Sequence, residues 1–212
     1  GVEGLDIGNP VRGSIRAVAG APYEPPGEDG PIYLLVFGGS QGARIMREVP
    51  EALAHLPGDL RARLVIAHQA RDEDEEYVRA AYDALELPAD IRPFFDDMPE
   101  QLVKAQLVIC RSGASTVADL SAVGRPSILI PFGAALRDEQ TANARGLAEA
   151  GGAFVLAEDA VTPEVLAGHI QAILSDGEGA AAAATAAASL GKPDATVSLA
   201  ELVEALAGTR NV

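Results

Sequence analysis

Two glycine-containing turns carry the residues best suited to bind an anion. Residues 36–43 read Val-Phe-Gly-Gly-Ser-Gln-Gly-Ala, so that an apolar strand is expected to run into a glycine-rich turn that opens a helix. Residues 107–116, Leu-Val-Ile-Cys-Arg-Ser-Gly-Ala-Ser-Thr, repeat this order. A helix start carries unpaired backbone N–H groups and partial positive charge, and it can hold a phosphate without a lysine. Two such turns predict two anion-binding edges, a pattern suited to a nucleotide diphosphate.

Both turns also have a simpler interpretation. Their glycines are expected to adopt positive φ angles or to allow close approach of the backbone: Gly38, Gly39, Gly42 and Gly113. Their hydroxyls, among them Ser40, Ser115 and Thr116, could donate to a ligand or cap the helices. The segment GGSQGA has neither the spacing of the dinucleotide motif nor the lysine of the P-loop. A single turn therefore leaves both interpretations open.

Composition narrows the class of partner. The chain has 212 residues and a formal net charge of −15, which argues against a nucleic-acid partner and against adhesion of this segment to anionic lipid. The lone Cys110 excludes an internal disulfide, fits a reducing compartment and is expected to be buried. No run approaches membrane-spanning length, and the first residues lack a signal-peptide pattern.

Alternating strand and helix patterns predict the fold that must position these turns. Apolar runs near 32–37, 63–68, 91–95, 106–110, 126–130 and 153–156 alternate with amphipathic stretches, which predicts an α/β fold with a parallel sheet and helices on both faces. In such sheets, ligands bind at the carboxyl ends of the strands, where both turns lie.

The two ends of the chain have different patterns. Residues 13–31 are expected to form a linker or irregular loop, and the alanine-rich residues 178–190 a helix. Residues 195–207 predict a last amphipathic helix. Its apolar stripe is interpreted as core or as a domain contact rather than as a membrane surface.

An ordered set of motifs resembles the carboxyl-terminal half of the MurG family of glycosyltransferases. The set is Asn9-Pro10-Val11-Arg12, Gly38–Arg44, His68-Gln69, Phe95–Met98, Arg111–Val117, Gly124-Arg125-Pro126 and Gln140–Ala144. Together these motifs span nearly the whole chain, in order and with similar spacing. The family transfers N-acetylglucosamine (GlcNAc) from UDP-GlcNAc to lipid I, the undecaprenyl-pyrophosphoryl-MurNAc-pentapeptide, forming lipid II for peptidoglycan by an inverting mechanism.

The resemblance implies the Rossmann-like, donor-binding half of a two-domain GT-B enzyme. It divides the chain into an interdomain segment and loop at 1–31, a UDP-sugar-binding domain at 32–176, and carboxyl-terminal helices at 177–212 that pack on this domain or on a missing amino-terminal half. That half is expected to supply the general base, the lipid I contacts and the membrane contact, so the chain alone is expected to be inactive. The whole enzyme would be cytoplasmic and peripheral on the cell membrane, with no cofactor.

The resemblance also assigns substrate-binding residues. Arg12 and Ser40 would contact the donor diphosphate, and Phe95 would mark the position where backbone groups read the uracil edge. The backbone N–H groups of residues 114–116 (Ala114, Ser115 and Thr116) would lie beside the sugar and diphosphate. Asp119, where the family usually has glutamate, would bind the ribose hydroxyls. Gln140 and Asn143 would read the GlcNAc hydroxyls.

Other interpretations remain open at this point. Asp96-Asp97 is read as a helix-start signal rather than as a metal site, and the three histidines form no zinc pattern, so no metal is expected. The chain could belong to another GT-B transferase that uses a UDP-sugar, for example in glycolipid synthesis. It could also be a non-catalytic nucleotide-sugar-binding subunit.

Overall fold

Short apolar runs form the strands of one parallel sheet. The structure is a computed structural model that describes residues 4–133 and 139–208, so the ends of the predicted first and last segments lie outside the described part. The strands are β1 (Ile32–Phe37), β2 (Leu64–Gln69), β3 (Ala89–Arg92), β4 (Leu107–Cys110), β5 (Ser127–Leu129) and β6 (Ala153–Val155). Their order is β3-β2-β1-β4-β5-β6, and every pairing is parallel. The predicted α/β fold is confirmed.

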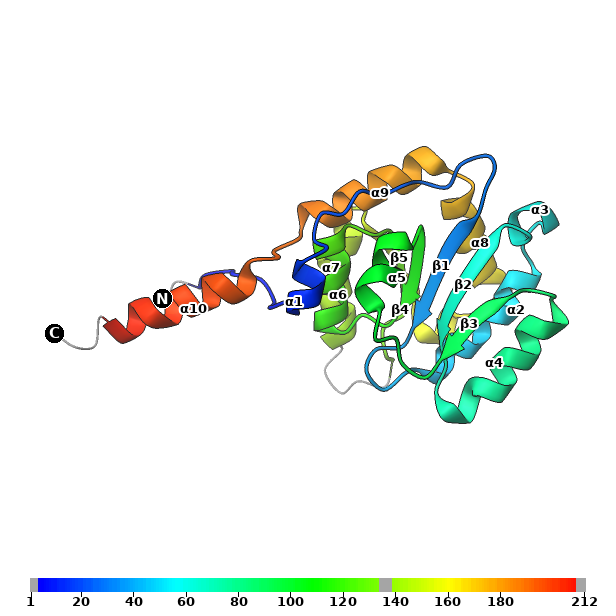
Figure 1. Ribbon diagram of the computed structural model, residues 1–212, viewed down its shortest axis with the longest axis horizontal. Coiled ribbons are helices and arrows are strands. Elements are labelled where there is room, and N and C mark those ends of the chain that lie inside the picture. The colour runs from blue at the N-terminus through cyan, green and yellow to red at the C-terminus, as the bar shows by residue number, and fades with distance from the viewer. Residues whose placement is uncertain (1–3, 134–138, 209–212) are drawn as a thin grey trace.

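Helices cover both faces of this sheet, because side chains of each strand alternate between the faces (Figure 1). In β1, Leu34 and Val36 belong to one apolar cluster, whereas Leu35 and Phe37 belong to the other. The first cluster is completed by α2 (Val49–Ala54), α3 (Gly58–Arg61), α4 (Asp72–Ala84) and α8 (Pro163–Leu174). The second is completed by α1 (Gly13–Arg16), α5 (Met98–Lys104), α6 (Ala114–Val123), α7 (Glu139–Glu149) and α9 (Gly177–Ser189).

The segment before β1 is more ordered than a linker. Residues 13–16 form helix α1, and its Ile15 is fully buried in the second apolar cluster. The prediction of an irregular loop over 13–31 is therefore wrong for α1. Its physical reason is the burial of Ile15, which stabilises one helical turn that the glycine and proline content of the segment does not predict.

Arg125 connects the segment before β1 to the ends of two helices through hydrogen bonds. Its guanidinium group is fully buried and donates to six backbone carbonyls, those of Ala21, Pro22, Leu102, Val103, Val123 and Gly124. The last four belong to the carboxyl-terminal turns of α5 and α6, where carbonyls lack intrahelical donors and carry partial negative charge. The arginine thus joins residues 21–22 to both helices.

The carboxyl-terminal helices behave differently from each other. Helix α9 packs against α6 and α8, as its buried Ala180, Ala184 and Ala187 indicate. Helix α10 (Ala195–Gly208) forms as predicted but extends away from the sheet (Figure 1). Val197, Leu199, Val203 and Leu206 are 39–60% exposed. The interpretation of this stripe as core of the described domain is wrong, whereas packing of α10 on an amino-terminal half stays a prediction.

Candidate functional site

The two glycine turns lie next to each other in space because β1 and β4 are neighbours. Phe37, the last residue of β1, pairs with Cys110, the last residue of β4. The strand order reverses between these two strands, and in open parallel sheets this is the place where a crevice forms for a ligand. The sheet topology therefore brings both predicted anion-binding turns to one crevice.

The first turn is built tightly around its glycines. Gly39 and Gly42 have φ angles of 88° and 67°, as predicted. Gly38 does not have a positive φ, but a Cβ at this position would lie 2.1 Å from the backbone nitrogen of Ala43. The next element is a short 3-10 helix, η1 (Arg44–Glu48), with Ala43 at its N-cap. The turn therefore does not open an α-helix directly, and Ser40 is not an N-cap.

Gln69, at the end of β2, fixes this turn through its carboxamide. Its Oε1 accepts from the Gly38 N–H at 3.0 Å, and its Nε2 donates to the carbonyls of Gly39 and Pro93 at 3.0 and 3.1 Å. One side chain therefore joins the ends of β1, β2 and β3. Phe95 follows in the loop after β3, because this strand occupies residues 89–92 instead of the predicted 91–95; Pro93, which has no N–H group, ends it.

The second turn leads directly into α6. Gly113 is the N-cap, with a φ of −59°, so the positive φ that glycine allows is not used here, and no side chain caps the helix. The first intrahelical bond runs from the Val117 N–H to the Gly113 carbonyl at 3.0 Å. The backbone N–H groups of Ala114, Ser115 and Thr116 precede that bond, so the helix offers three donors and its positive dipole end at this point.

Asp119 lies one turn further along α6 and is paired with Arg12. Its side chain is 7% exposed, and its Oδ2 is 2.7 Å from Nη2 of Arg12, whose side chain is 59% exposed. Burial raises the pKa of Asp119, and the Arg12 guanidinium acts in the opposite direction. The second carboxylate oxygen of Asp119, Oδ1, has no hydrogen-bond partner among the described residues and can accept from a ligand.

Residues of α7 meet the end of β4. Ser112 Oγ donates to the backbone carbonyl of Gln140 at 2.8 Å, and Asn143 Nδ2 donates to the Ser112 carbonyl at 3.1 Å. The Phe132 N–H donates to Gln140 Oε1 at 3.0 Å. Backbone groups therefore orient the carboxamides of Gln140 and Asn143. Recognition of ligand hydroxyl groups by hydrogen bonds requires side chains that are held in this way.

A partly buried ion pair lies on the same side of the crevice. Arg111, with a side chain 8% exposed, donates from Nη2 to Glu158 Oε1 at 2.6 Å. Glu158 belongs to the 3-10 helix η2 (Glu158–Ala160) that follows β6. The Arg111 guanidinium and the Gly133 N–H both lower the pKa of Glu158. The carboxylate consequently remains ionised at neutral pH.

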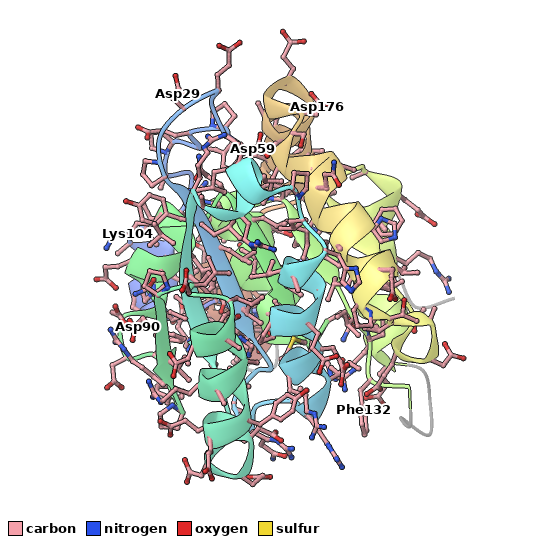
Figure 2. The ribbon with its side chains drawn as sticks, turned by 90° about the vertical axis from the view of Figure 1, so that its right-hand side faces the viewer. Asp29, Asp59, Asp90, Lys104, Phe132 and Asp176 are labelled. Carbon is pink, nitrogen blue, oxygen red and sulfur yellow. The ribbon has the colours of Figure 1, made fainter. Side chains whose placement is uncertain are left out.

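These elements surround a cavity of about 630 Å³, which falls within the size range of small-molecule sites. Phe132, which lines this cavity, lies in the lower part of the view in Figure 2, whereas Asp29, Asp59 and Asp176 lie in its upper part. The cavity brings together most of the predicted binding residues: Arg12, Ser40, Phe95, Ser115, Thr116, Asp119 and Gln140. Ala114 and Asn143 are not among the lining residues; they belong to the elements that form its wall.

Other lining residues were not singled out as ligand contacts. They include Arg44, Gln69, Arg71, Arg111, Phe132 and Glu158. Arg71 is paired with Glu73 and Asp74, and Arg111 with Glu158, whereas Arg44 makes no ion pair with a described residue. The sequence could have indicated Arg44 and Arg111 as binding residues, because they lie in the two turn motifs. Nothing local in the sequence marks Glu158.

Among the described residues, no group of three or more His, Cys, Asp or Glu side chains is arranged to hold a metal ion. Asp97, at the N-cap of α5, accepts instead from Arg92 and Gln101. Within residues 4–133 and 139–208, no helix has the length and apolar character needed to cross a membrane.

Known proteins are similar to this chain over most of its length. The chain is 48% identical over 206 residues to the Brucella abortus UDP-N-acetylglucosamine--N-acetylmuramyl-(pentapeptide) pyrophosphoryl-undecaprenol N-acetylglucosamine transferase, covering 97% of the chain and 54% of the relative. It therefore spans about half the length of the curated relatives it matches.

Solved structures agree with this match. The crystal structure of Acinetobacter baumannii MurG aligns with a TM-score of 0.76 and 32% identity, over 84% of this chain and 53% of that one. WaaG, a glycosyltransferase involved in lipopolysaccharide biosynthesis, aligns at 0.62 and 18% identity over 82% and 47%, a likeness of fold alone. Residues 33–199 match the model of the glycosyltransferase family 28 C-terminal domain, and the chain belongs to that family.

Proposed function

We propose that the chain is the donor-binding half of an inverting glycosyltransferase that transfers GlcNAc from UDP-GlcNAc to lipid I, forming lipid II. The observation that carries this proposal is the crevice between β1 and β4, into which a glycine turn and the start of α6 both open. The relatives named for this transfer reaction support the choice of substrates.

Several positive or hydrogen-bond-donating groups surround the proposed position of the diphosphate. In the proposal, the diphosphate lies between the turn at residues 38–43 and the first N–H groups of α6, with the Ser40 hydroxyl as a further donor. Arg44 contributes a positive charge that no described carboxylate neutralises. Arg12 adds positive charge to the same site while it holds Asp119.

The remaining parts of the donor have partners of matching chemistry. Asp119 accepts from the ribose hydroxyls, and Gln140 and Asn143 bind the sugar hydroxyls with carboxamides that can both donate and accept. Phe95 is 1% exposed, so its backbone rather than its ring would read the uracil edge. Substitutions of this side chain would then act on packing more than on base recognition.

The chain's part in the reaction is electrostatic. In a direct displacement, an acceptor hydroxyl attacks the anomeric carbon while UDP leaves, and negative charge develops on the diphosphate. The α6 N-terminus, Arg44 and Arg12 would stabilise that charge. We propose that an amino-terminal half supplies the general base, the lipid I contacts and attachment to the cytoplasmic face of the cell membrane. The chain alone then binds the donor without transferring GlcNAc.

Isothermal titration calorimetry tests the proposal directly. The chain is titrated with UDP-GlcNAc, UDP-glucose and UDP, alongside Asp119→Ala and Gln140→Ala. We expect Asp119→Ala to weaken binding of all three ligands by about 10- to 100-fold, because a charge-assisted hydrogen bond is lost. Gln140→Ala should reduce the preference for UDP-GlcNAc over UDP by about tenfold.

Matched controls lie on exposed helix surfaces. Asp83→Ala on α4 and Gln171→Ala on α8 remove the same side chains away from the crevice and should leave all affinities unchanged. The proposal fails if the wild-type chain binds none of the ligands and a chain joined to an amino-terminal half also binds none. Transfer of GlcNAc to lipid I by the chain alone would overturn the division of labour between the halves.

A further inference from the structure

A side chain contacts the backbone of each residue of segment 130–133, and the Ile130 N–H also donates to the Cys110 carbonyl at 2.8 Å. Arg111 Nη1 donates to the carbonyls of Ile130 and Pro131 at 3.1 and 2.9 Å. The Phe132 N–H donates to Gln140 Oε1 at 3.0 Å, and the Gly133 N–H donates to Glu158 Oε2 at 2.8 Å. Two side chains from outside the segment, Arg111 and Glu158, therefore account for three of these four side-chain contacts.

Glu158 connects these contacts into one unit. Its Oε1 accepts from Arg111 at 2.6 Å while its Oε2 holds Gly133, so a single carboxylate fixes both the arginine and the far end of the segment. Arg111 is almost fully buried, and Glu158 is its only ion-pair partner among the described residues. Without the carboxylate, a buried guanidinium would lose its counter-charge and would rearrange toward other acceptors.

Ordering of this segment affects Gln140 through its hydrogen bond with Phe132. The Phe132 N–H donates to the carboxamide oxygen of Gln140 and so orients that side chain, whose amide nitrogen has no hydrogen-bond partner among the described residues and whose oxygen keeps a second lone pair. The position of this N–H depends on residues 130–133 being fixed. The Arg111 guanidinium also lies 5.2 Å from the centre of the Phe132 ring, which adds a second constraint on the same residue.

We propose that Glu158 is a positioning residue that orients the Gln140 carboxamide through Arg111 and segment 130–133, and thereby sets the selectivity of the pocket for the donor sugar. This inference rests on the proposed function, because it is that proposal which places the sugar beside Gln140. Glu158 itself contacts no part of the donor in this scheme. Its loss should reduce sugar discrimination and leave UDP affinity unchanged.

The first part of the test needs no ligand. Amide exchange of Phe132 and Gly133 is measured by NMR in the wild-type chain, in Glu158→Ala and in the control Asp159→Ala, which removes an exposed carboxylate from the same 3-10 helix. We expect Glu158→Ala to speed exchange of both amides by about fivefold. Phe132 is the diagnostic amide, because its acceptor is Gln140 and not Glu158. Unchanged exchange at Phe132 would overturn the proposal.

The second part is a double-mutant cycle on ligand selectivity. The ratio of the Kd for UDP to the Kd for UDP-GlcNAc is measured in Glu158→Ala, Gln140→Ala and the double variant. If Glu158 acts through Gln140, Glu158→Ala lowers the ratio with UDP affinity unchanged, and the double variant equals Gln140→Ala. Glu158→Gln, which keeps an acceptor for Gly133, should restore part of the ratio. Additive effects, or no change in the ratio, would refute the positioning role.

The two parts separate failure of this inference from failure of the proposed function. If the wild-type chain shows no preference for UDP-GlcNAc over UDP, the sugar assignment is wrong. In that case the exchange of Phe132 still decides whether Glu158 orders segment 130–133 and Gln140.

Discussion

Replacing Arg125 by methionine should destabilise the chain by about 2–5 kcal/mol. Three of the carbonyls that accept from Arg125, those of Leu102, Val123 and Gly124, make these bonds in fully buried surroundings. An unsatisfied buried carbonyl costs ~1–2 kcal/mol, so these three give about 3–6 kcal/mol. Methionine recovers ~1 kcal/mol by burying an apolar side chain, which leads to the stated value.

Lysine at position 125 should keep part of the stability that methionine loses. The other three carbonyls are partly exposed and can bind water after the substitution. Arg125→Lys keeps a positive charge at the carboxyl-terminal ends of α5 and α6 but has three donors instead of five. We therefore expect Arg125→Lys to lose about half as much stability as Arg125→Met.

Urea unfolding followed by circular dichroism measures these changes, provided that the slope m stays constant. Arg16→Met is the matched control, because its pair with Asp194 lies between two largely exposed side chains and should contribute less than ~1 kcal/mol. A loss below ~1 kcal/mol for Arg125→Met, or full stability in Arg125→Lys, would refute the view that buried carbonyls at two helix ends depend on this guanidinium.

Three further predictions concern titration and packing. Burial lowers the pKa of His68 from 6.5 to about 3, so the unfolded chain binds the proton at a higher pH than the folded chain. The contribution of neutral His68 to the free energy of unfolding is therefore fully present well above pH 6.5 and is lost as the pH falls toward 3. Between pH 6.5 and 5, wild type should lose about 1.6 kcal/mol more stability than His68→Gln in urea unfolding, and equal losses would contradict this. Gly152→Ala should lower the melting temperature, because its Cβ would lie 2.8 Å from the α9 backbone, whereas Gly168→Ala, with open space around it in α8, should raise it. Arg12→Gln should raise the pKa of Asp119 further, as followed by carboxyl NMR titration, and a fall would show that Arg12 does not stabilise the carboxylate.

Local patterns predict most of the fold. The apolar runs around β1 and β4 mark strands because both faces of the sheet are covered, and the glycines after them mark turns. The predicted helix directly after Ala43 is wrong because the α-helix begins only at Val49. Pro50 fits the first turn of a helix, where its missing N–H is not needed, and this residue could have indicated the later start.

The parts of the site that depend on distant residues could not be predicted from such patterns. Arg111 and Glu158 are 47 residues apart, and their contact depends on how the turn after β6 packs beside the end of β4. The pairing of Arg12 with Asp119 spans 107 residues and depends on the burial of Ile15 in α1. Motif resemblance places Arg12 and Asp119 near a donor, but only the tertiary packing shows that they bind each other.

The adjacency of β1 and β4 has a kinetic consequence. β1 can pair with β2 after a short excursion of the chain, but its pairing with β4 closes a loop of about seventy residues, which is slow because of its entropic cost. The crevice does not exist until that closure is complete, since one turn comes from each strand. A ligand of this crevice should therefore slow unfolding while leaving the folding rate nearly constant, because it binds only after the rate-limiting closure.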